Sequence, residues 1–497
     1  MNTYLGQKGY TILKNELSIE KQNKIKNDLT IKPYTPGAPG TNDKVTYQAY
    51  RESPNKIYVP HYYGVEHFGS PSEVKISEGV NINLEFNGQL RDYQIPVVDK
   101  YIQHVTSSKN GVEGGGGGGL LELPCAYGKT VLSINIISHL KKKTLVIVHK
   151  EFLMNQWIER IQQFLPNAKV GKIQGQIIDI DNKDIVIGML QSLSMKEYPA
   201  SIFESFGLTI IDEVHHISSE VFSNCLFKLV TKYMLGLSAT MNRKDGTTNV
   251  FKMFLGQVIF KGKREEQMNV IVRAINYYIN DEDFNREETD FRGNPAYSTM
   301  ISKLCDYNRR TEFILKIISD MILENPNQQI MILAHNKSIL KYLHDAIKHR
   351  NITTCGYYVG GMKEQALKET ETKNIVIATY AMASEALDIK TLTTLIMITP
   401  KTDIQQSVGR ILREKHSQPI VVDIIDSHSI FQNQWKKRRL FYIKENYKII
   451  HTKSNEYNSN TDLWETIYEP GEKSKKCCKK IEKNDNPLQG TCFIKLK

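Results

Sequence analysis

The chain has 497 residues, of which 40% are hydrophobic, and a formal net charge of +11 at pH 7. This length exceeds what one hydrophobic core serves and predicts about two to four domains. No apolar run reaches the roughly 18 to 20 residues of a membrane span, and the first residues lack the charged-then-apolar pattern of a signal peptide, so we expect an intracellular protein without membrane contact. The charge permits an anionic partner such as nucleic acid. Seven scattered cysteines without a CxxC pair fit a reducing compartment and predict neither a zinc site nor a disulfide framework.

Residues 1–88 have a character of their own. A Pro/Gly-rich loop at 31–40 precedes short, aromatic, β-prone pieces at 56–69, a pattern that predicts a small α+β or mostly β accessory domain. Its Tyr and His side chains could stack on nucleic-acid bases. The simpler interpretation, which we favour, is that they fill a small core.

The segment 90–94 leads into a predicted helix, and six consecutive glycines follow at 114–119. A glycine tract has no side chains to bury and a large entropic cost of ordering, so we expect a mobile, low-complexity loop in front of the next strand. The apolar positions of the helix are Ile95, Val97, Val98 and Ile102.

The stretch 120–130 reads Leu-Leu-Glu-Leu-Pro-Cys-Ala-Tyr-Gly-Lys-Thr: a short apolar strand, a turn through Pro and Gly, and Lys-Thr at the start of a helical run. This is the layout of a nucleoside-triphosphate P-loop. Backbone N–H groups cradle the phosphates, Lys129 reaches the β- and γ-phosphates, and the Thr130 hydroxyl binds Mg²⁺. The strict pattern has Gly where this chain has Leu123. The predicted nucleotide-binding residues here are Pro124, Cys125, Ala126, Tyr127, Gly128, Lys129 and Thr130.

Short, continuous, β-branched runs alternate with helical segments along most of the remaining chain. Such runs are typical of buried parallel strands, so we predict an α/β fold with two consecutive parallel sheets, joined by the charged stretch around 281–294. The runs are 144–148, 184–188 and 208–212 in the first sheet, then 329–334, 374–379, 394–399 and 419–425 in the second.

We therefore place domain boundaries at 1–88, 89–262 and 263–450, with a flexible basic tail at 451–497. Residues 471–497 hold eight lysines against three acids, a net of +5. The tail is either a solvated segment or an arm that binds along the phosphate backbone of nucleic acid, and we give the two interpretations equal weight.

Asp212 and Glu213 directly follow the apolar strand 208–211. Carboxylates at the C-terminal end of a buried parallel strand stand where such sheets bind ligands. Asp212 would hold Mg²⁺ directly or through water, and Glu213 would orient and deprotonate the attacking water.

His215 is the fourth residue of the motif that begins at Asp212. Together with the phosphate loop, this motif resembles a superfamily 2 helicase of the DExH type, a family with two RecA-like domains. The resemblance implies that Gln94 reads adenine, that 148–157 and 188–192 contact nucleic acid, and that 375–388 is motif V, with Asp388 at the nucleotide. It further implies that His215, Ser238, Ala239 and Thr240 couple hydrolysis to strand movement.

The resemblance also gives Gln406, Arg410 and Arg413 catalytic roles. Residues 410 and 413 are three apart, so on a helix they share a face, and in this family they reach across to the γ-phosphate. Arginine fingers in other phosphoryl-transfer systems are worth on the order of 10³–10⁵ in rate. The alternative is that both arginines only pair with surface carboxylates.

An Arg-Lys-Asp element at 243–245, just after the Ser-Ala-Thr motif, is similar to the XPB-like branch of DNA translocases. Segments 50–53 and 57–69 more loosely resemble its large-DNA-virus relatives of the poxvirus transcript-release type. Ala126 and Ala386 stand where the family usually has Gly; because Ala restricts positive φ, the loop at 126 is expected to differ slightly.

The sequence thus predicts a motor that hydrolyses ATP with Mg²⁺ and moves along nucleic acid, DNA being favoured, in the 3′ to 5′ direction. The resemblance places it in viral transcription termination or transcript release, with the transcription machinery as a partner and a viral factory or virion as its location. The alternatives are an RNA helicase and a nucleotide-dependent clamp whose hydrolysis is vestigial.

Overall fold

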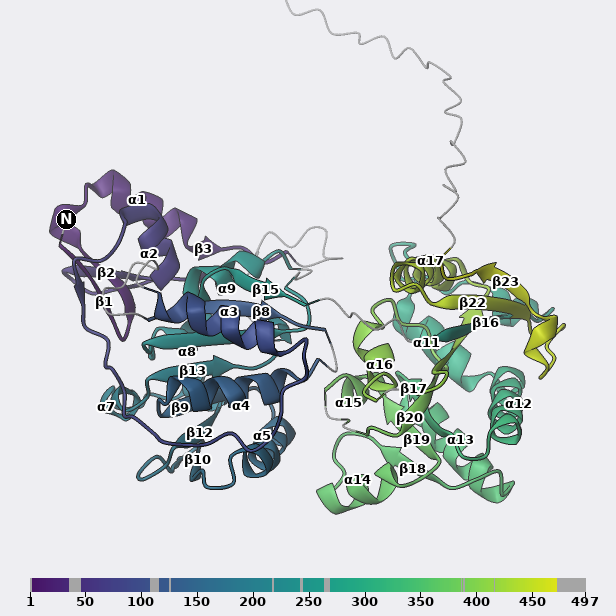
Figure 1. Ribbon diagram of the computed structural model, residues 1–497. Helices are drawn as coiled ribbons and strands as arrows, with labels where there is room; N and C mark the ends of the chain where they lie inside the picture. The colour runs from purple at the N-terminus through teal and green to yellow at the C-terminus, as the bar shows by residue number, and fades with distance from the viewer. Residues whose placement is uncertain are drawn as a thin grey trace, which may run out of the picture.

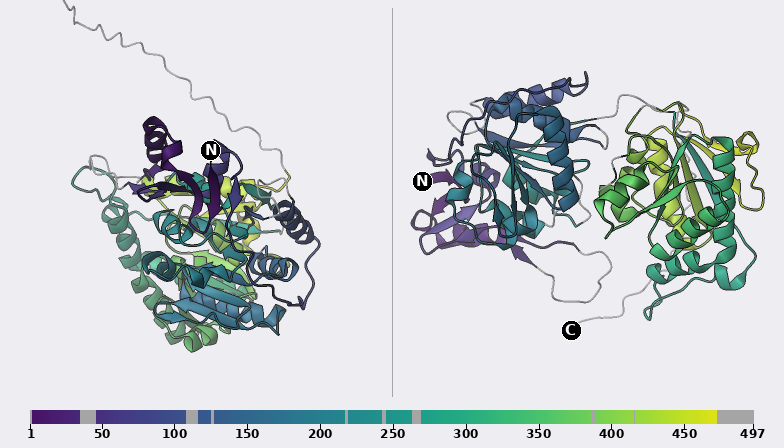
Figure 2. Two further views of the ribbon diagram at one scale, coloured as in Figure 1. Left: turned by 90° about the vertical axis from the view of Figure 1, so that its left-hand side faces the viewer. Right: turned by 90° about the horizontal axis from the view of Figure 1, so that it is seen from below.

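The computed structural model describes residues 2–34, 46–107, 116–124, 127–216, 219–241, 245–262, 269–385, 387, 389–414 and 416–471. Within these ranges, none of the helices combines the length and the apolar character needed to cross a membrane. Figures 1 and 2 show two α/β lobes side by side, with the N-terminal unit packed on the first lobe.

The N-terminal unit is a five-stranded sheet in the order β5-β6-β2-β1-β7, flanked by two helices, which confirms the α+β prediction. Several of its tyrosines lie in the core, as we favoured: Tyr10 and Tyr63 are buried with Ile57 and Val59, whereas Tyr34 is exposed. The elements are β1 (Thr3–Gly6), β2 (Gly9–Leu13), α1 (Ile19–Asp28), β5 (Arg51–Glu52), β6 (Lys56–Val59), α2 (His61–Phe68) and β7 (Glu73–Val74), together with the separate pair β3 (Thr30–Ile31) and β4 (Tyr47–Gln48).

The first lobe is an eight-stranded sheet in the order β11-β10-β12-β9-β13-β14-β8-β15, parallel except at β11. Its strands are β8 (Gly117–Glu122), β9 (Thr144–Val148), β10 (Val170–Gln174), β11 (Ile177–Ile178), β12 (Ile185–Met189), β13 (Leu208–Ile211), β14 (Tyr233–Ser238) and β15 (Val258–Lys261). The helices are α3 (Ile95–Thr106), α4 (Lys129–Leu140), α5 (Glu151–Phe164), α6 (Leu190–Met195), α7 (Ser201–Glu204), α8 (Ser219–Leu226) and α9 (Thr248–Leu255).

The sheet is buried on both faces, which is why its strands read as continuous apolar runs. One core packs α3, α4 and α5 against one face, with Val146 and Ile210 among its strand residues, and a second core packs α6 to α9 against the other. All three strands predicted here are present, with ends that agree to within about two residues.

The glycine tract is not a loop where the structure describes it, and this part of the prediction is wrong. Gly117, Gly118 and Gly119 open strand β8 and pair with β14. The strand is crowded: a Cβ on Gly118 would lie 2.6 Å from the carbonyl oxygen of Leu255, and the Tyr62 hydroxyl bonds both the N–H and the carbonyl of Gly118. The glycines permit this close approach of backbone to backbone, and the resulting strand pairing offsets the entropic cost of ordering them.

The second lobe is an eight-stranded sheet in the order β18-β19-β17-β20-β21-β16-β22-β23, parallel except at β23. Its strands are β16 (Ile271–Tyr277), β17 (Gln329–Ala334), β18 (Cys355–Tyr358), β19 (Ile375–Thr379), β20 (Leu392–Met397), β21 (Ile420–Asp426), β22 (Lys448–Lys453) and β23 (Glu465–Tyr468). The helices are α10 (Glu282–Asn285), α11 (Tyr297–Asp306), α12 (Asn308–Glu324), α13 (Lys337–His349), α14 (Glu364–Glu371), α15 (Tyr380–Glu385), α16 (Gln405–Arg410) and α17 (Ser429–Lys444).

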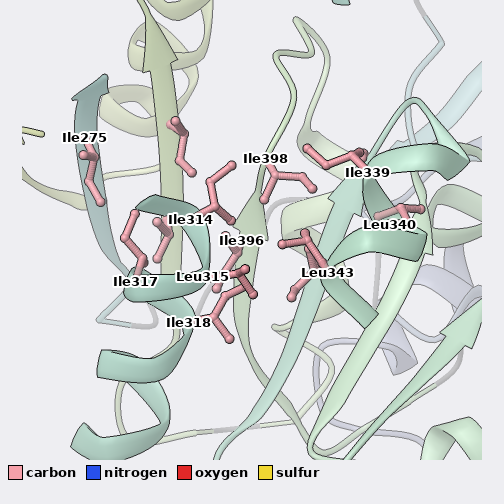
Figure 3. Close-up of a cluster of buried hydrophobic side chains, with 14 of the residues drawn as sticks. Ile275, Ile314, Leu315, Ile317, Ile318, Ile339, Leu340, Leu343, Ile396 and Ile398 are labelled. Carbon is pink, nitrogen blue, oxygen red and sulfur yellow. The ribbon is translucent and has the colours of Figure 1, made fainter. Parts of the chain in front are cut away.

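Apolar faces of α12 and α13 cover one side of this sheet. Figure 3 shows Ile314, Leu315 and Ile318 of α12 beside Ile396 of β20, with Leu343 of α13 in the same cluster. The two RecA-like parallel sheets predicted from the sequence are thus confirmed.

Two expectations about the ends of this lobe need correction. The charged stretch 281–294 does not join the sheets, because β16 before it already belongs to the second sheet. The segment expected to be a tail from residue 451 is folded as far as β23: β22 pairs with β16, and β23 folds back on β22 as an antiparallel partner. Residues 472–497, with the lysines of the tail, lie outside the described residues, and the boundaries at 88 and 262 stay a prediction.

Candidate ATP site between the two sheets

The phosphate loop begins where β8 ends and finishes at the start of α4. Gly128 precedes this helix with φ 83, a conformation that side chains disfavour. A Cβ there would also lie only 2.3 Å from the Gln94 side-chain nitrogen, so a larger residue would in addition displace the Gln94 amide. Lys129 and Thr130 open the helix, where backbone N–H groups favour anions. Cys125 and Ala126 lie outside the described residues.

Lys129 and Glu213 form the central ion pair of the site. The Lys129 ammonium lies 2.7 Å from Glu213 Oε1, with the two side chains only 12% and 21% exposed. Glu213 has φ 49, an uncommon conformation for a residue with a side chain. Its N–H donates to Asp212 Oδ1 at 2.9 Å, which binds the two neighbouring acids into one turn.

Asp212 is a buried carboxylate that directly follows β13. Burial, followed by the charge of Glu213, raises its pKa to about 6, while Lys129 and a hydrogen bond from Trp157 oppose this rise. Asp212 and Thr130 line the same cleft, and a carboxylate and a hydroxyl supply the oxygen ligands that Mg²⁺ prefers. Asp212 and Thr130 therefore fit the metal that the family implies.

Trp157 was expected in a nucleic-acid-contacting segment, but it is 1% exposed on α5 and its indole N–H donates to Asp212 Oδ2 at 2.9 Å. Through this bond Trp157 orients the Asp212 carboxylate. The apolar spacing of α5 predicts that this residue is buried, and only the fold shows what its N–H meets.

The coupling residues form a chain of hydrogen bonds that ends in the other lobe. The Gln406 side-chain nitrogen lies 3.0 Å from His215 Nε2, and His215 Nδ1 lies 2.8 Å from the Ser238 hydroxyl oxygen. An amide nitrogen only donates, so Nε2 accepts, the proton sits on Nδ1, and Nδ1 donates to Ser238. Ser238 in turn donates to the Thr240 carbonyl, and Ala239 between them is buried.

Helix α16 brings the second lobe to this site. Gln406 and Arg410 lie on it and Arg413 follows it; the Arg410 guanidinium donates to the carbonyl of Leu387 at 2.7 Å. Asp388, the predicted motif V residue, lies outside the described residues.

Groups from both lobes line one cleft of about 370 Å³, a size suited to a nucleotide-sized ligand. From the first lobe it is lined by Gln94, Tyr127, Gly128, Lys129, Thr130, Asp212 and Glu213, and from the second by Gln406, Arg410 and Arg413. Among the described residues predicted for the site, five are absent from this lining: Pro124, His215, Ser238, Ala239 and Thr240. Pro124 stands just before the loop, and the other four stand along the hydrogen-bonded chain that leads to Gln406.

Sequence reasoning missed several charged residues of the cleft. Arg91 and Arg160 line it in the first lobe, and Lys390 and Glu414 in the second. Arg160 stands one helical turn after Trp157 on α5, so the helical spacing could have found it. Lys390 comes from a loop, and its sequence carries no such signal.

Comparisons with known proteins agree with this architecture. Residues 87–243 match the model of the family described as the res subunit of type III restriction enzymes. The "putative ATP-dependent RNA helicase" of Acanthamoeba polyphaga mimivirus is 35% identical over 464 residues, covering 90% of this chain and 86% of the relative. A protein of the same description from African swine fever virus is 27% identical over 443 residues, covering 80% of each chain.

Among solved structures, a fragment of a "putative HsdR subunit of a type I restriction enzyme" from Vibrio vulnificus has a TM-score of 0.52 at 15% identity, covering 74% of this chain and 70% of that one. This likeness concerns the fold. The mimivirus similarity covers 90% of this chain. The chain therefore belongs to the superfamily 2 helicases, in the group that includes these viral proteins, and is an ATP-hydrolysing enzyme of that family.

Proposed function

We propose that the protein is an ATP-driven motor that translocates along nucleic acid, with DNA as the favoured track and 3′ to 5′ as the direction. One observation carries the proposal: groups from both lobes converge on a single cleft, and Gln406 of the second lobe meets His215 of the first at 3.0 Å. A ligand in this cleft contacts both lobes, so its binding and hydrolysis change how the lobes are held together.

Lys129, Thr130 and Asp212 would hold Mg²⁺-ATP in the first lobe. The metal, when bound, neutralises charge on the phosphates. A phosphate competes with Glu213 for the Lys129 ammonium, and the carboxylate that this frees accepts a proton from the attacking water. Arg410 and Arg413 would stabilise the charge that develops on the γ-phosphate as the bond to the leaving oxygen breaks.

The hydrogen bonds that run from Gln406 through His215 to Ser238 and Thr240 would couple ATP hydrolysis to the conformation of the first lobe. His215 Nδ1 lies 3.3 Å from Glu213 Oε2, so the residue that activates water and the residue that bonds the second lobe are in contact. Loss of the γ-phosphate then weakens the hold between the lobes, and repeated closing and opening would move a strand. The presence of acid, lysine and arginines in one cleft supports turnover over a static clamp.

RNA is the second candidate track, because the mimivirus and African swine fever virus relatives are both described as RNA helicases. A grip on the phosphate backbone does not by itself distinguish the sugars. The proposed setting is transcript release during viral transcription, with the transcription machinery as a partner, in a viral factory or virion; it rests on the looser resemblance of the N-terminal unit.

Displacement of streptavidin from biotinylated single strands tests the proposal. The account predicts ATP-dependent displacement from the 5′ end of DNA, and little from the 3′ end, because the motor arrives at the 5′ end. Faster displacement from RNA would move the assignment to an RNA helicase, and displacement from the 3′ end would reverse the polarity. ATP hydrolysis without displacement from either strand would support the clamp.

A further inference from the structure

Tyr127 connects the phosphate loop to the segment that leads into α3. Its hydroxyl donates to the carbonyl oxygen of Tyr93 at 3.1 Å, and its ring meets the Tyr93 ring edge-on with 4.7 Å between centroids. Its own carbonyl oxygen accepts from the Gln94 side-chain nitrogen at 2.8 Å. One residue thus holds both the main chain before Gln94 and the Gln94 side chain.

The Gln94 amide is consequently fixed in one of its two orientations. Its nitrogen faces the Tyr127 carbonyl, and its oxygen accepts from the Arg91 N–H at 2.9 Å. The side chain is 4% exposed and lines the cleft. Each end of the amide keeps one further hydrogen-bonding position, a donor on the nitrogen and an acceptor on the oxygen.

A donor beside an acceptor matches only one kind of purine edge. The 6-amino purine offers an acceptor at N7 and a donor at its amino group, whereas the 6-oxo purine offers two acceptors. A Gln94 amide held in one orientation is complementary to the 6-amino purine. With the 6-oxo purine, the amide oxygen would face the purine oxygen, and two acceptors would meet. An amide free to rotate discriminates less.

The edge of the Tyr127 ring that points away from Tyr93 lies close to Gly262, the residue after β15. A Cβ on Gly262 would lie 3.1 Å from Tyr127 Cε2, and the Gly262 N–H donates to the Glu122 carbonyl at 2.8 Å. The ring is therefore held between Tyr93 on one side and backbone on the other, and Tyr127 is only 7% exposed. A methyl group added at Gly262 would press on this ring and on the Leu123 side chain, whose Cδ2 would lie 3.0 Å away.

We propose that Tyr127 is a positioning residue that determines nucleobase specificity: by fixing the Gln94 amide it makes the cleft select a 6-amino over a 6-oxo purine triphosphate. This inference rests on the proposed nucleotide site but not on hydrolysis or translocation. Tyr127 acts through Gln94, and its hydroxyl is the group that the family's phosphate-loop pattern does not require.

Equilibrium binding of ATP and of inosine triphosphate to the full chain tests this, with the ratio of dissociation constants as the readout. Tyr127→Phe removes the bond to Tyr93 and keeps the ring, and the preference for ATP should fall by about three- to tenfold, the range expected for one hydrogen bond. Gly262→Ala should lower the ratio in the same direction, because its methyl group presses on the Tyr127 ring although Gly262 itself does not line the cleft.

Tyr101→Phe is the matched control. The Tyr101 hydroxyl also donates to a backbone carbonyl, that of Met234 at 3.0 Å, in the buried core of the same lobe, so this variant loses an equivalent bond and should keep the wild-type ratio. An unchanged ratio in both Tyr127→Phe and Gly262→Ala would overturn the proposal. Failure of the wild type to bind either nucleotide would instead overturn the proposed nucleotide site itself.

Discussion

The side chains of His215 and Gln406 meet at 3.0 Å although 191 positions separate them in the chain. One stands after the acidic turn of the first sheet and the other on α16 of the second, so this single bond spans the two lobes. The same histidine contacts Ser238 and Glu213. It is the point at which water activation, the Ser-Ala-Thr motif and the second lobe come together.

Gln406→Ala should weaken this link between the lobes. The loss of one neutral hydrogen bond is worth about 0.5–1.5 kcal/mol, so we expect about a three- to tenfold fall in the nucleic-acid-stimulated rate of ATP hydrolysis. Steady-state ATPase assays measure this. Gln405→Ala, next to it on the same helix, is the control; an equal fall in both variants would deny a specific role to the bond with His215.

Lys129→Ala and Glu213→Gln should each reduce hydrolysis by at least about 10²-fold, since one removes the phosphate-binding charge and the other the general base. Glu213→Gln should still bind ATP, whereas Lys129→Ala should bind it more weakly. ATPase rates together with nucleotide titration separate the two effects. Glu220→Gln, an exposed acid in the same lobe, should be neutral, and near-normal turnover in Glu213→Gln would remove this residue from the mechanism.

Arg413→Lys keeps the charge but loses the planar fork of donors. If Arg413 stabilises the transition state, the rate should fall by about 10³-fold while the affinity for ATP changes little. Single-turnover hydrolysis at saturating ATP gives this rate. The surface variant Arg350→Lys is the control, and a loss confined to ATP affinity would reassign Arg413 to ground-state binding.

Gly118→Ala tests the crowding at the start of β8. The added methyl group would approach the backbone oxygen of Leu255, at 2.6 Å in the present structure, so we expect destabilisation of about 1–3 kcal/mol and a lower Tm for the first lobe. Gly360→Ala should be nearly neutral, because its Cβ would meet only Met382 Sδ at 3.9 Å. Equal Tm values for the two variants would contradict the packing account of the glycine tract.

His61 should make the stability of the chain fall in acid. Burial lowers its pKa from 6.5 to about 4, and among the described residues its Nε2 has no hydrogen-bond partner. Folding favours the neutral form of His61, so its contribution to stability is complete above about pH 6.5 and is lost as the pH falls towards 4. At 1.36 kcal/mol per pH unit, this contribution amounts to about 3 kcal/mol.

His61→Phe keeps a ring beside Tyr62, whose centroid lies 4.4 Å away, and removes the titration. Thermal unfolding between pH 7 and pH 4.5 should therefore be less steep in this variant than in the wild type. His349→Asn, at an exposed position, should leave the pH profile unaltered. A profile unaffected by His61→Phe would show that other groups cause the acid sensitivity.

The sequence predicts what is local and periodic. Strands β9 and β17 begin and end where their apolar runs do, because both faces of a parallel strand are buried and leave a continuous signal. The phosphate loop and the pair Asp212–Glu213 are also contiguous, so their residue types and spacing are enough to place them at the strand ends.

Contacts between residues far apart in the chain leave no such signal in the sequence. Trp157 donates to Asp212 across 55 positions, and its sequence context looks like that of any buried helical residue. The glycines of β8 look like a linker because the backbone atoms that crowd them belong to other segments. β16 was missed because Arg273 interrupts its apolar run; the structure pairs this arginine with Glu324 at 2.6 Å, which allows a charge in the strand.

The most direct test of the central claim is the steady-state ATPase rate of the full chain at one fixed salt concentration, without nucleic acid and with single-stranded DNA, duplex DNA or RNA. The account predicts a low basal rate that DNA stimulates more than RNA, and no stimulated rate in Glu213→Gln. A rate that none of the three nucleic acids changes would contradict it, because the cleft would then hydrolyse ATP without a nucleic-acid track to move on.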